Sequence, residues 1–279
     1  MSLENFQKTK DFLICVDSDG CAMDTMNIKH TSALGPCMVE EWDLEEWKEP
    51  ILERWNEINL FSMTRGINRF KGLAKALAEV DQTYTPIEDI KSLQKWIKES
   101  DELSNSSLQR TIDKTDSICL KKALNWSITA NKRISSLSFD VKKPFPGAKE
   151  GIAYAHQYAD IAVVSSANLE AVEEEWKYYG LAEHVNTILA QDAGSKAFCI
   201  GSLLKKGYDP ANVLMLGDAP GDYDAAKKNG VFYYPILVNH EQESWKEFRE
   251  TAVSKLIDHT YIGNYQDEKV TAFLKNLGA

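Results

Sequence analysis

Three aspartates lie close together near the start of the sequence, in the stretch VDSDGCAMDT: Asp17, Asp19 and Asp24. The apolar run FLICV at residues 12–16 precedes them and is typical of a buried strand. Asp17 and Asp19 are two residues apart, so both can face the same space near the end of that strand. Carboxylates this close repel each other unless a cation lies between them or one holds a proton. Both conditions suit phosphoryl transfer, in which one carboxylate attacks phosphorus and the other protonates the leaving oxygen.

A structural interpretation of the same residues remains open. Aspartate is common in turns and as the N-cap of a helix, so Asp17, Asp19 and Asp24 could be turn formers and caps. Gly20 allows a tight turn in either case. The first pair alone does not decide between the two interpretations, because a short motif is weak evidence.

A second acidic cluster, GDAPGDYD, follows another apolar run and contains Asp218, Asp222 and Asp224. Mg²⁺ takes oxygen ligands and keeps several waters, so a few carboxylates are enough to hold it. Asp218 and Asp222 are therefore candidate metal ligands or supports of a ligand. We expect Asp224 to be exposed in the first turn of a helix, where the helix dipole favours an acidic residue.

Two further positions could hold a phosphate group. Ser165 ends the apolar run IAVV, and its hydroxyl could donate to a phosphate oxygen, helped by free N–H groups at the start of the next helix. Ser166 is the competing choice, and a plain N-cap serine is the structural alternative. Lys196 lies before the second acidic cluster and could supply the positive charge that converging carboxylates and a phosphate require, although a solvated lysine is the simpler interpretation.

The elements that would position these residues alternate along the chain. Short apolar runs at 12–16, 161–164 and 213–216 predict parallel strands that are covered on both faces. Helical patterns lie between and after them, at residues 147–159, 168–180, 196–207 and 222–230. This alternation predicts an α/β fold with a doubly wound parallel sheet, in which ligands bind beyond the carboxyl ends of the strands.

A long segment interrupts this pattern. Residues 21–145 contain amphipathic stretches and little that resembles a strand, so we expect a mostly α-helical insert. The polar tract 99–111 predicts a loop or a helix cap within it. The predicted domains are therefore an α/β core at 1–20 and 146–279 and a helical insert at 21–145. From about residue 236 onward, helix-like stretches predict extra helices that pack on the core.

Composition restricts the class of protein. The formal net charge of -10 argues weakly against nucleic acid or an anionic membrane as the partner. The five cysteines form an odd set without CxxC spacing, so we expect free thiols and not a disulfide framework or a zinc site. No apolar run approaches the roughly 18 residues that a membrane span needs. Together with an N-terminus that lacks a signal-peptide pattern, these features lead us to expect a soluble, cytoplasmic protein.

The motifs together resemble those of the haloacid dehalogenase superfamily of phosphotransferases. The family's first motif, a strand followed by DxD, is matched by Asp17 and Asp19, and its fourth, GDxxxD, runs from Gly217 to Asp222. Ser165 and Lys196 match the second and third motifs in the family's order. The DGxxxDT pattern ending at Thr25 and the segment PFPGA are similar to family members that carry a helical cap inserted after the first motif.

The resemblance implies a role for each residue. Asp17 would be the nucleophile that forms an aspartyl-phosphate, and Asp19 the general acid and base. Ser165 and Lys196 would hold the phosphoryl group. Mg²⁺ would be bound by Asp17, the backbone carbonyl of Asp19 and Asp218, with Asp222 as a ligand or a support.

The implied activity is Mg²⁺-dependent hydrolysis of a small phosphorylated metabolite. Retention of Asp19 argues against the dehalogenase members, which attack carbon and do not need it. A phosphomutase of sugar phosphates and a non-catalytic binding module on the same fold remain alternatives.

Substrate selectivity would come from the insert, which would close over the site as a cap. Arg65 and Arg69, in the segment SMTRGINRF, could bind a second anionic group or a sugar hydroxyl. Pairing with the insert's glutamates on a solvated helix is the alternative interpretation.

Overall fold

The computed structural model describes residues 3–279 and contains two compact units. The core unit runs to Met26 and resumes at Phe139–Ala279, and the insert unit is Asn27–Ser138. The first boundary between the units, at 26/27, lies six residues after the predicted boundary at 20/21. The second, at 138/139, lies seven residues before the predicted boundary at 145/146. The reason is that the two connecting segments pair with each other in the core unit. The amide of Asp24 donates to the carbonyl of Lys143 (2.7 Å), and the amide of Phe145 donates to the carbonyl of Ala22 (3.0 Å).

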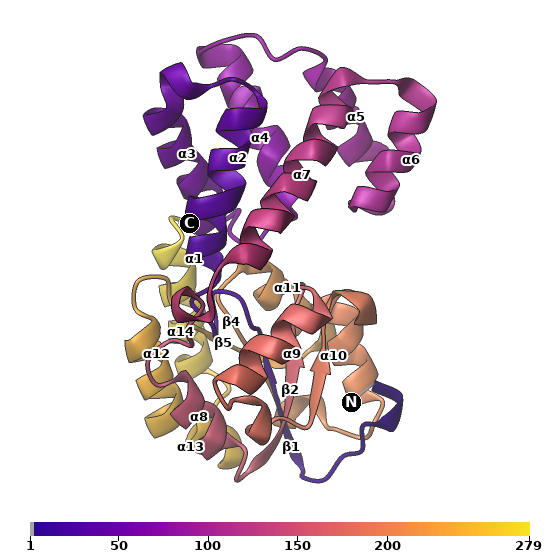
Figure 1. Cartoon of the computed structure of the whole chain (residues 1–279). Coiled ribbons are helices and arrows are strands. Elements are labelled where there is room, and N and C mark those ends of the chain that lie inside the picture. Colours follow the sequence, from indigo (N-terminus) through magenta and orange to yellow (C-terminus); the bar gives the residue numbers. More distant parts are fainter. Residues whose placement is uncertain (1–2) are drawn as a thin grey trace. The chain divides into compact units, whose positions relative to one another are not determined.

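The core unit is built on one parallel sheet of five strands in the order β3-β2-β1-β4-β5 (Figure 1). The strands are β1 (Phe12–Val16), β2 (Ala159–Val164), β3 (Thr187–Leu189), β4 (Val213–Gly217) and β5 (Phe232–Pro235). The parallel α/β fold predicted from the sequence is confirmed. The three predicted strands form the centre of the sheet and are almost entirely buried.

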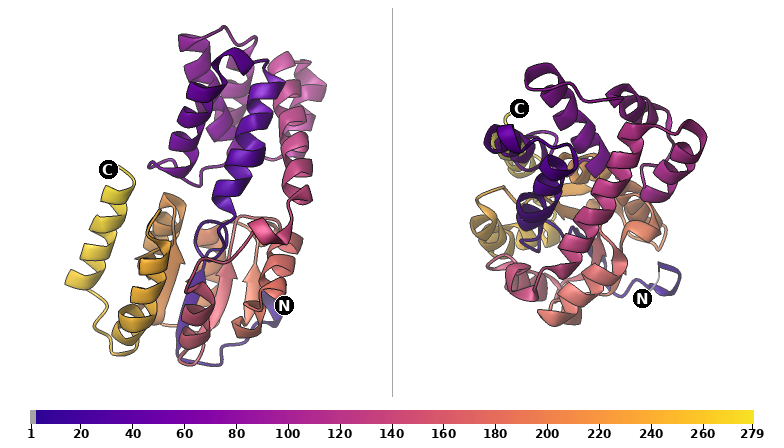
Figure 2. Two further views of the ribbon diagram at one scale, coloured as in Figure 1. Left: turned by 60° about the vertical axis from the view of Figure 1, so that its left-hand side comes forward. Right: turned by 45° about the horizontal axis from the view of Figure 1, so that its top comes forward.

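Helices cover both faces of this sheet, as the views in Figure 2 show. They are α8 (Ala148–Ala155), α9 (Leu169–Tyr178), α10 (Lys196–Leu204), α11 (Pro220–Asn229), α12 (Glu241–Glu247), α13 (Val253–Ile257) and α14 (Asn264–Asn276). Alternate residues of β1 belong to different apolar clusters: Ile14 and Val16 to one, Leu13 and Cys15 to the other. Since successive strand residues point to opposite faces, the core unit has one apolar layer on each side of its sheet.

The C-terminal part of the chain contributes to both layers. Trp245 and Phe248, from α12 and the π-helical turn η8 (Phe248–Ala252) that follows it, belong to the cluster of Ile14. Phe273 of α14 belongs to the cluster of Leu13. These helices thus pack on both faces of the sheet, and α14 lies beside β5.

The insert unit is helical and has an apolar core of its own. It contains most of α1 (Met26–Lys29), the π-helical turn η2 (His30–Leu34), α2 (Gly35–Glu41), α3 (Lys48–Leu60), α4 (Arg69–Thr83), α5 (Ile90–Glu99), α6 (Asn105–Thr115) and α7 (Ile118–Ser136). All buried members of this core lie between Leu34 and Ala130. The polar tract 99–111 is only partly a loop, because Ser104 caps α6 by accepting from the amide of Ser107 and the helix begins at the next residue.

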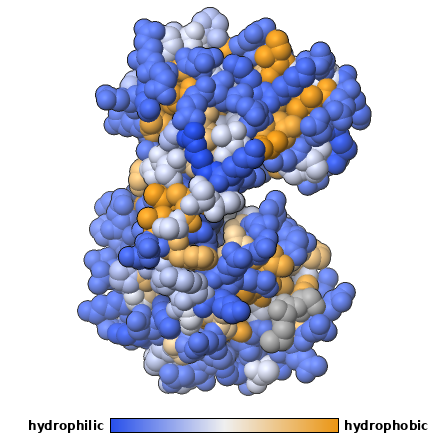
Figure 3. All heavy atoms as spheres, viewed as in Figure 1, coloured by the Kyte–Doolittle hydropathy of each residue, from blue (hydrophilic) through white to orange (hydrophobic). Residues whose placement is uncertain are grey.

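Hydrophilic residues cover most of the face of each unit drawn in Figure 3, in keeping with the net charge of -10. Within residues 3–279, no helix combines the length and the apolar character that crossing a membrane requires.

Candidate active site

The carboxyl ends of the adjacent strands β1 and β4 bring the two acidic motifs together. The amide of Asp17 donates to the carbonyl of Leu216 (3.0 Å), which fixes the start of the first loop against the second strand. Asp17, Asp218 and Asp222 each place a carboxylate oxygen within 4.8 Å of the other two. All three residues are buried, with exposed fractions of 3%, 0% and 0%. Two motifs about 200 residues apart in the sequence therefore form one carboxylate cluster.

Lys196 contacts this cluster from the first position of α10. Its ammonium lies 2.8 Å from Oδ2 of Asp17 and 2.5 Å from Oδ1 of Asp222. Burial favours the neutral amine, but the carboxylates of Asp17 and Asp222 outweigh burial and raise the pKa of Lys196 above its usual value. Lys196 is therefore a charged partner of the cluster and not a solvated lysine.

The cluster holds more negative than positive charge. Counted by formal charge, three carboxylates and one ammonium sum to -2. Burial raises the pKa of Asp17, the charge of Lys196 opposes this, and Asp222 and Asp218 raise it further, so that the net direction is upward. The same carboxylates, after burial, raise the pKa of the Cys21 thiol. A divalent cation among these oxygens would balance the charge, and hard cations such as Mg²⁺ prefer carboxylate ligands. The donor set therefore fits the expected metal.

The segment between β1 and α1, residues 17–25, is called the β1 loop and is held by several hydrogen bonds to its backbone. The amide of Ser18 donates to Oδ1 of Asp17 (2.8 Å). The carbonyl of Ser18 accepts from the amides of Ala22 (3.0 Å) and Met23 (2.9 Å). Gly20 has a φ of 85°, a left-handed conformation that favours glycine. Asp19 lies in this turn, two residues after Asp17.

Asp19 is partly buried, and its carboxylate lies next to Thr25. The Thr25 hydroxyl donates to Oδ1 of Asp19 at 2.5 Å, and Thr25 is fully buried. Asp24 is exposed and lies two residues before α1 begins. Thr25 was not singled out as a candidate site residue, although the DT pair that contains it was noted in the sequence.

The turn between β4 and α11 holds the side chain of Asp222, and Gly217 leaves the space that this side chain occupies. Oδ2 of Asp222 accepts from the amide of Ala219 (3.1 Å). A Cβ on Gly217 would lie 2.3 Å from both Cβ and Cγ of Asp222, so this position requires glycine. Tyr233 of β5 donates its hydroxyl to the carbonyl of Gly217 (3.0 Å). Asp224 is exposed, as predicted, but it lies beyond the first turn of α11, because the helix begins at Pro220 and Asp222 is the acidic residue of that turn.

The two serines after β2 differ in their surroundings. Ser165 is buried (3% exposed), and its hydroxyl oxygen accepts from the amide of Ala167 (3.1 Å), whereas Ser166 is exposed. Neither is the N-cap of α9, because Asn168 fills that position by accepting from the amide of Ala171 (3.2 Å). The alternative of a plain N-cap serine is therefore wrong for this site.

Arg65 and Arg69 belong to the insert unit, where both make local contacts. Arg65 is buried (2% exposed) and donates through Nη1 to the carbonyl of Leu60 (2.7 Å). Arg69 begins α4 and donates through Nη1 to Oδ1 of Asn131 (2.6 Å) and, more distantly, to Oγ of Ser127 (3.5 Å). Arg65 does not fit the alternative of a solvated helical residue, because it is buried and lies in a loop.

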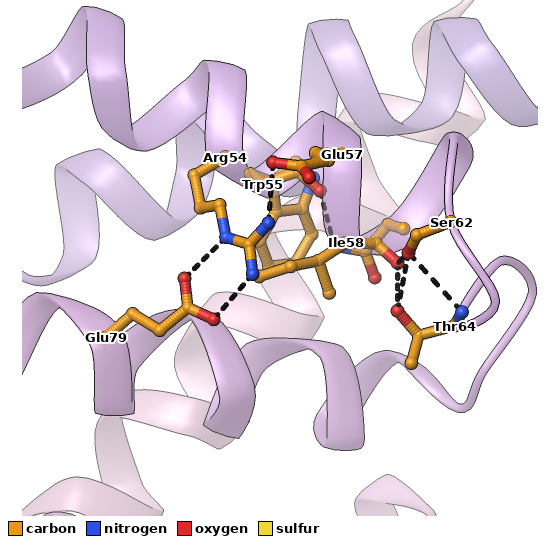
Figure 4. A network of polar contacts seen from close by, with 8 residues as sticks. Arg54, Trp55, Glu57, Ile58, Ser62, Thr64 and Glu79 are labelled. Carbon is orange, nitrogen blue, oxygen red and sulfur yellow. Dashed lines mark hydrogen bonds and ion pairs between the residues drawn. The ribbon is translucent and has the colours of Figure 1, made fainter. Parts of the chain in front are cut away.

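Polar contacts also fix the loop that leads to Arg65. Figure 4 shows Ser62 and Thr64 turned toward the carbonyl of Ile58, to which their hydroxyls donate at 3.3 Å and 2.6 Å. In the same view, Arg54 is held between Glu57 and Glu79.

Two tryptophans outside the insert contact the β1 loop and were not predicted as part of the site. Trp176 of α9 donates its indole N–H to the hydroxyl of Ser18 (2.9 Å). Trp245 of α12 donates its indole N–H to the carbonyl of Cys21 (2.9 Å). Both side chains are fully buried. No local pattern marks them, because the paired residues are 158 and 224 positions apart.

Comparison with solved structures gives a similar fold across most of the chain. A proposed phosphoglycolate phosphatase from Lactobacillus delbrueckii subsp. bulgaricus shares 17% identity, covers 97% of this chain and 100% of its own, and has a TM-score of 0.54. A predicted phosphoglycolate phosphatase from Haemophilus somnus shares 15% identity over 81% of this chain and 86% of its own, with a TM-score of 0.49. The first of these similarities shows a shared fold. A comparison with curated protein sequences gives no significant match.

A family profile covers more than half of the sequence. The profile described as haloacid dehalogenase-like hydrolase matches residues 83–235. The matched range contains Ser165, Lys196 and the GDxxxD motif, while Asp17 and Asp19 precede it. The chain belongs to the haloacid dehalogenase-like hydrolase family.

Proposed function

We propose that the protein is a Mg²⁺-dependent phosphatase that hydrolyses a small phosphorylated metabolite through an aspartyl-phosphate on Asp17. The observation that carries this proposal is the position of Asp17. Its carboxylate is buried at the end of a central strand, bonded to the ammonium of Lys196 and close to the carboxylates of Asp218 and Asp222. A purely structural aspartate in a turn would not need two further buried carboxylates and a buried lysine beside it.

The contacts of Asp17 suit a nucleophile. The amide of Ser18 binds one of its oxygens and Lys196 the other, so the carboxylate is oriented at both atoms. Burial favours the protonated acid, and Lys196 favours the ionised form that can attack phosphorus. The carboxylate would attack in line, and the bond from phosphorus to the leaving oxygen would break.

Asp19 would move the protons in both steps. In the first step it would donate a proton to the leaving oxygen of the ester. In the second it would accept a proton from the water that attacks the aspartyl-phosphate, which releases inorganic phosphate and restores Asp17. The hydrogen bond from Thr25 keeps the Asp19 carboxylate in one orientation between these steps.

Asp17, Asp218 and the backbone carbonyl of Asp19 would hold Mg²⁺. Asp222 is already bonded to Lys196 and to the amide of Ala219, and it would act mainly as a support. When bound, Mg²⁺ would neutralise charge on the transferring phosphoryl group. Lys196 and Ser165 would bind the phosphoryl oxygens. Ser165 is preferred over Ser166 because it is buried directly at the end of β2.

We further propose that the insert unit is a cap that determines substrate choice. Arg69 would contribute a charged group for a second anion or a hydroxyl of the substrate, since it is partly exposed. Arg65 is buried and would act by holding the loop before α4.

The test is hydrolysis across a panel of phosphate monoesters, with Mg²⁺ or with EDTA, by the wild type and by Asp17→Asn. We expect turnover that requires Mg²⁺ and falls at least about 1,000-fold in Asp17→Asn. Asp24→Asn is the matched control, because it removes an exposed carboxylate from the same segment and should retain activity. Equal activity of Asp17→Asn and Asp24→Asn would refute the assignment. Conversion of one sugar phosphate into another without phosphate release would instead identify a phosphomutase.

A further inference from the structure

Ser18 is the residue on which the geometry of the β1 loop depends. Its amide bonds the Asp17 carboxylate, and its carbonyl accepts from the amides of Cys21 (3.3 Å), Ala22 (3.0 Å) and Met23 (2.9 Å). A displacement of Ser18 would move the peptide units on both sides of it, and would therefore disturb the orientation of Asp17 and the turn that carries Asp19 together.

The side chain of Ser18 has a specific partner. Its hydroxyl oxygen accepts the indole N–H of Trp176 at 2.9 Å, and both residues are fully buried. A buried indole N–H that lost this acceptor would lose a hydrogen bond without gaining water. The pair therefore favours one position of Ser18 relative to α9.

The last turn of α9 is itself firmly anchored to the segment that leads back from the insert. Glu175 forms a buried ion pair with Lys142 (3.4 Å), with side chains that are 3% and 11% exposed. The hydroxyl of Tyr179 donates to the carbonyl of Phe139, and the ring of Phe139 stacks on that of Tyr178. Trp176 thus extends from a helix end that several contacts hold in place, which makes it a fixed support for Ser18.

We propose that Trp176 is a positioning residue: its hydrogen bond fixes Ser18, whose amide orients Asp17 and whose carbonyl holds the turn that carries Asp19. This inference extends the proposed function to a residue outside the family's four motifs, and its effect on turnover rests on that function. The structural part of the inference, that Trp176 orders the β1 loop, does not depend on the proposed function.

The experiment compares Trp176→Phe, Ser18→Ala and the double variant by hydrogen–deuterium exchange and by steady-state kinetics. Trp176→Phe keeps an aromatic ring and removes the donor, and Ser18→Ala removes only the acceptor. In each single variant the amides of Cys21, Ala22 and Met23 should exchange about tenfold faster. The value of kcat should fall roughly 3- to 30-fold with KM changed less than about twofold. The double variant should be no worse than the poorer single variant, because both changes remove the same bond.

Tyr234→Phe is the matched control. It also removes a buried donor, but this hydroxyl bonds the carbonyl of Ser244 (2.8 Å) and not the β1 loop. It should leave exchange at residues 21–23 and kcat unchanged. If Trp176→Phe does not fold, Ser18→Ala decides the question alone.

Unchanged exchange at residues 21–23 in the single variants, or losses that multiply in the double variant, would overturn the inference. If the wild type hydrolyses no phosphate ester, the proposed function fails, and the exchange measurement still decides whether Trp176 orders the loop.

Discussion

The hydroxyl of Thr25 bonds the carboxylate of Asp19 at 2.5 Å, and this one contact restricts where the proposed general acid can point. Thr25→Val has nearly the same shape but no donor. We expect kcat to fall about tenfold, because a hydrogen bond to a charged group contributes roughly 1.5–3 kcal/mol and its loss frees the carboxylate to rotate. Thr25→Ser keeps the hydroxyl and should stay within about threefold of the wild type. Equal kcat values for Thr25→Val and Thr25→Ser would show that this contact does not matter for turnover.

The charges of single residues also explain why Lys196 is part of the site. Its ammonium bonds Asp17 and Asp222, but together with Asp218 the formal charges of the cluster still sum to -2. A second lysine could reduce this charge, yet it would fill the space that a phosphoryl group needs. A divalent cation reduces it as well and also offers coordination positions to phosphate oxygens. The cluster is thus better suited to a metal and a phosphate than to a closed set of ion pairs.

At the scale of elements, the turn between β4 and α11 depends on one glycine. Gly217→Ala would place a Cβ 2.3 Å from the Cβ and Cγ of Asp222, so Asp222 would have to leave Ala219 and Lys196. We expect a loss of about 2–4 kcal/mol in the free energy of unfolding and a large loss of activity.

Gly221→Ala, in α11 four residues further along the chain, is the matched control for that change. A Cβ at Gly221 meets no atom within 4 Å, and alanine is favoured over glycine in a helix by roughly 0.5–1 kcal/mol. This variant should therefore keep its activity and its stability. Urea unfolding and ester hydrolysis on the same preparations measure both quantities, and two variants of equal stability would contradict the steric argument.

The elements also show how far the sequence alone could lead. The three central strands were predicted within two residues at each end, because continuous apolar runs of four or five residues are typical of strands buried on both faces. The edge strands β3 and β5 were not predicted, since β3 has only three residues and β5, FYYP, ends in a proline, which is atypical of a strand interior. In the insert, the helix α6 was predicted partly as a loop because its first half, NSSLQRT, is polar.

The candidate site, like the fold, could be predicted from the sequence only in part. Asp17, Lys196, Asp218 and Asp222 could be proposed from the sequence, because each belongs to a short motif, and the structure brings these four together. The contacts that hold the motifs could not be proposed. The bonds of Trp176 and Trp245 to the β1 loop join residues that only the folded chain brings near each other.

At the scale of the whole molecule, Asp160 ties the N-terminal segment to the sheet and should affect stability in acid. Its carboxylate, at the start of β2, accepts from the amides of Thr9 (2.8 Å) and Lys10 (3.0 Å) and from the hydroxyl of Tyr208 (2.5 Å). Burial raises the pKa of Asp160, but these bonds and the Thr9 hydroxyl outweigh burial and hold the pKa below its usual value.

A lowered pKa in the folded state stabilises the protein above the usual aspartate pKa of about 3.9, and this stabilisation is lost as the pH falls through the folded-state pKa. Asp160→Asn should therefore cost about 2–4 kcal/mol at pH 7, and its difference from the wild type should shrink near pH 3. Asp11→Asn changes an exposed surface partner of Lys8 and should have little effect at either pH. Urea unfolding at both pH values gives the differences. A gap between wild type and Asp160→Asn that stays constant would contradict the assigned role.

The two units each have a separate apolar core, so the insert should be removable. All buried members of the insert's core come from the insert itself. In the core unit, the bonds from Asp24 to Lys143 and from Phe145 to Ala22 hold the two connecting segments side by side. We expect a chain in which residues 27–138 are replaced by about six glycine and serine residues to fold, because a short flexible linker can join such neighbouring segments.

This shortened chain also tests the proposed cap. It should still hydrolyse a small aryl phosphate in the presence of Mg²⁺, since every proposed catalytic residue lies in the core unit. It should lose most of the discrimination between phosphorylated metabolites that the full chain shows in the same panel. Asp17→Asn in the shortened chain is the control for contaminating phosphatases and should be inactive. If the shortened chain folds by circular dichroism and keeps the full chain's preferences, the insert does not determine substrate choice, and selectivity must arise from the loops at the carboxyl ends of the strands.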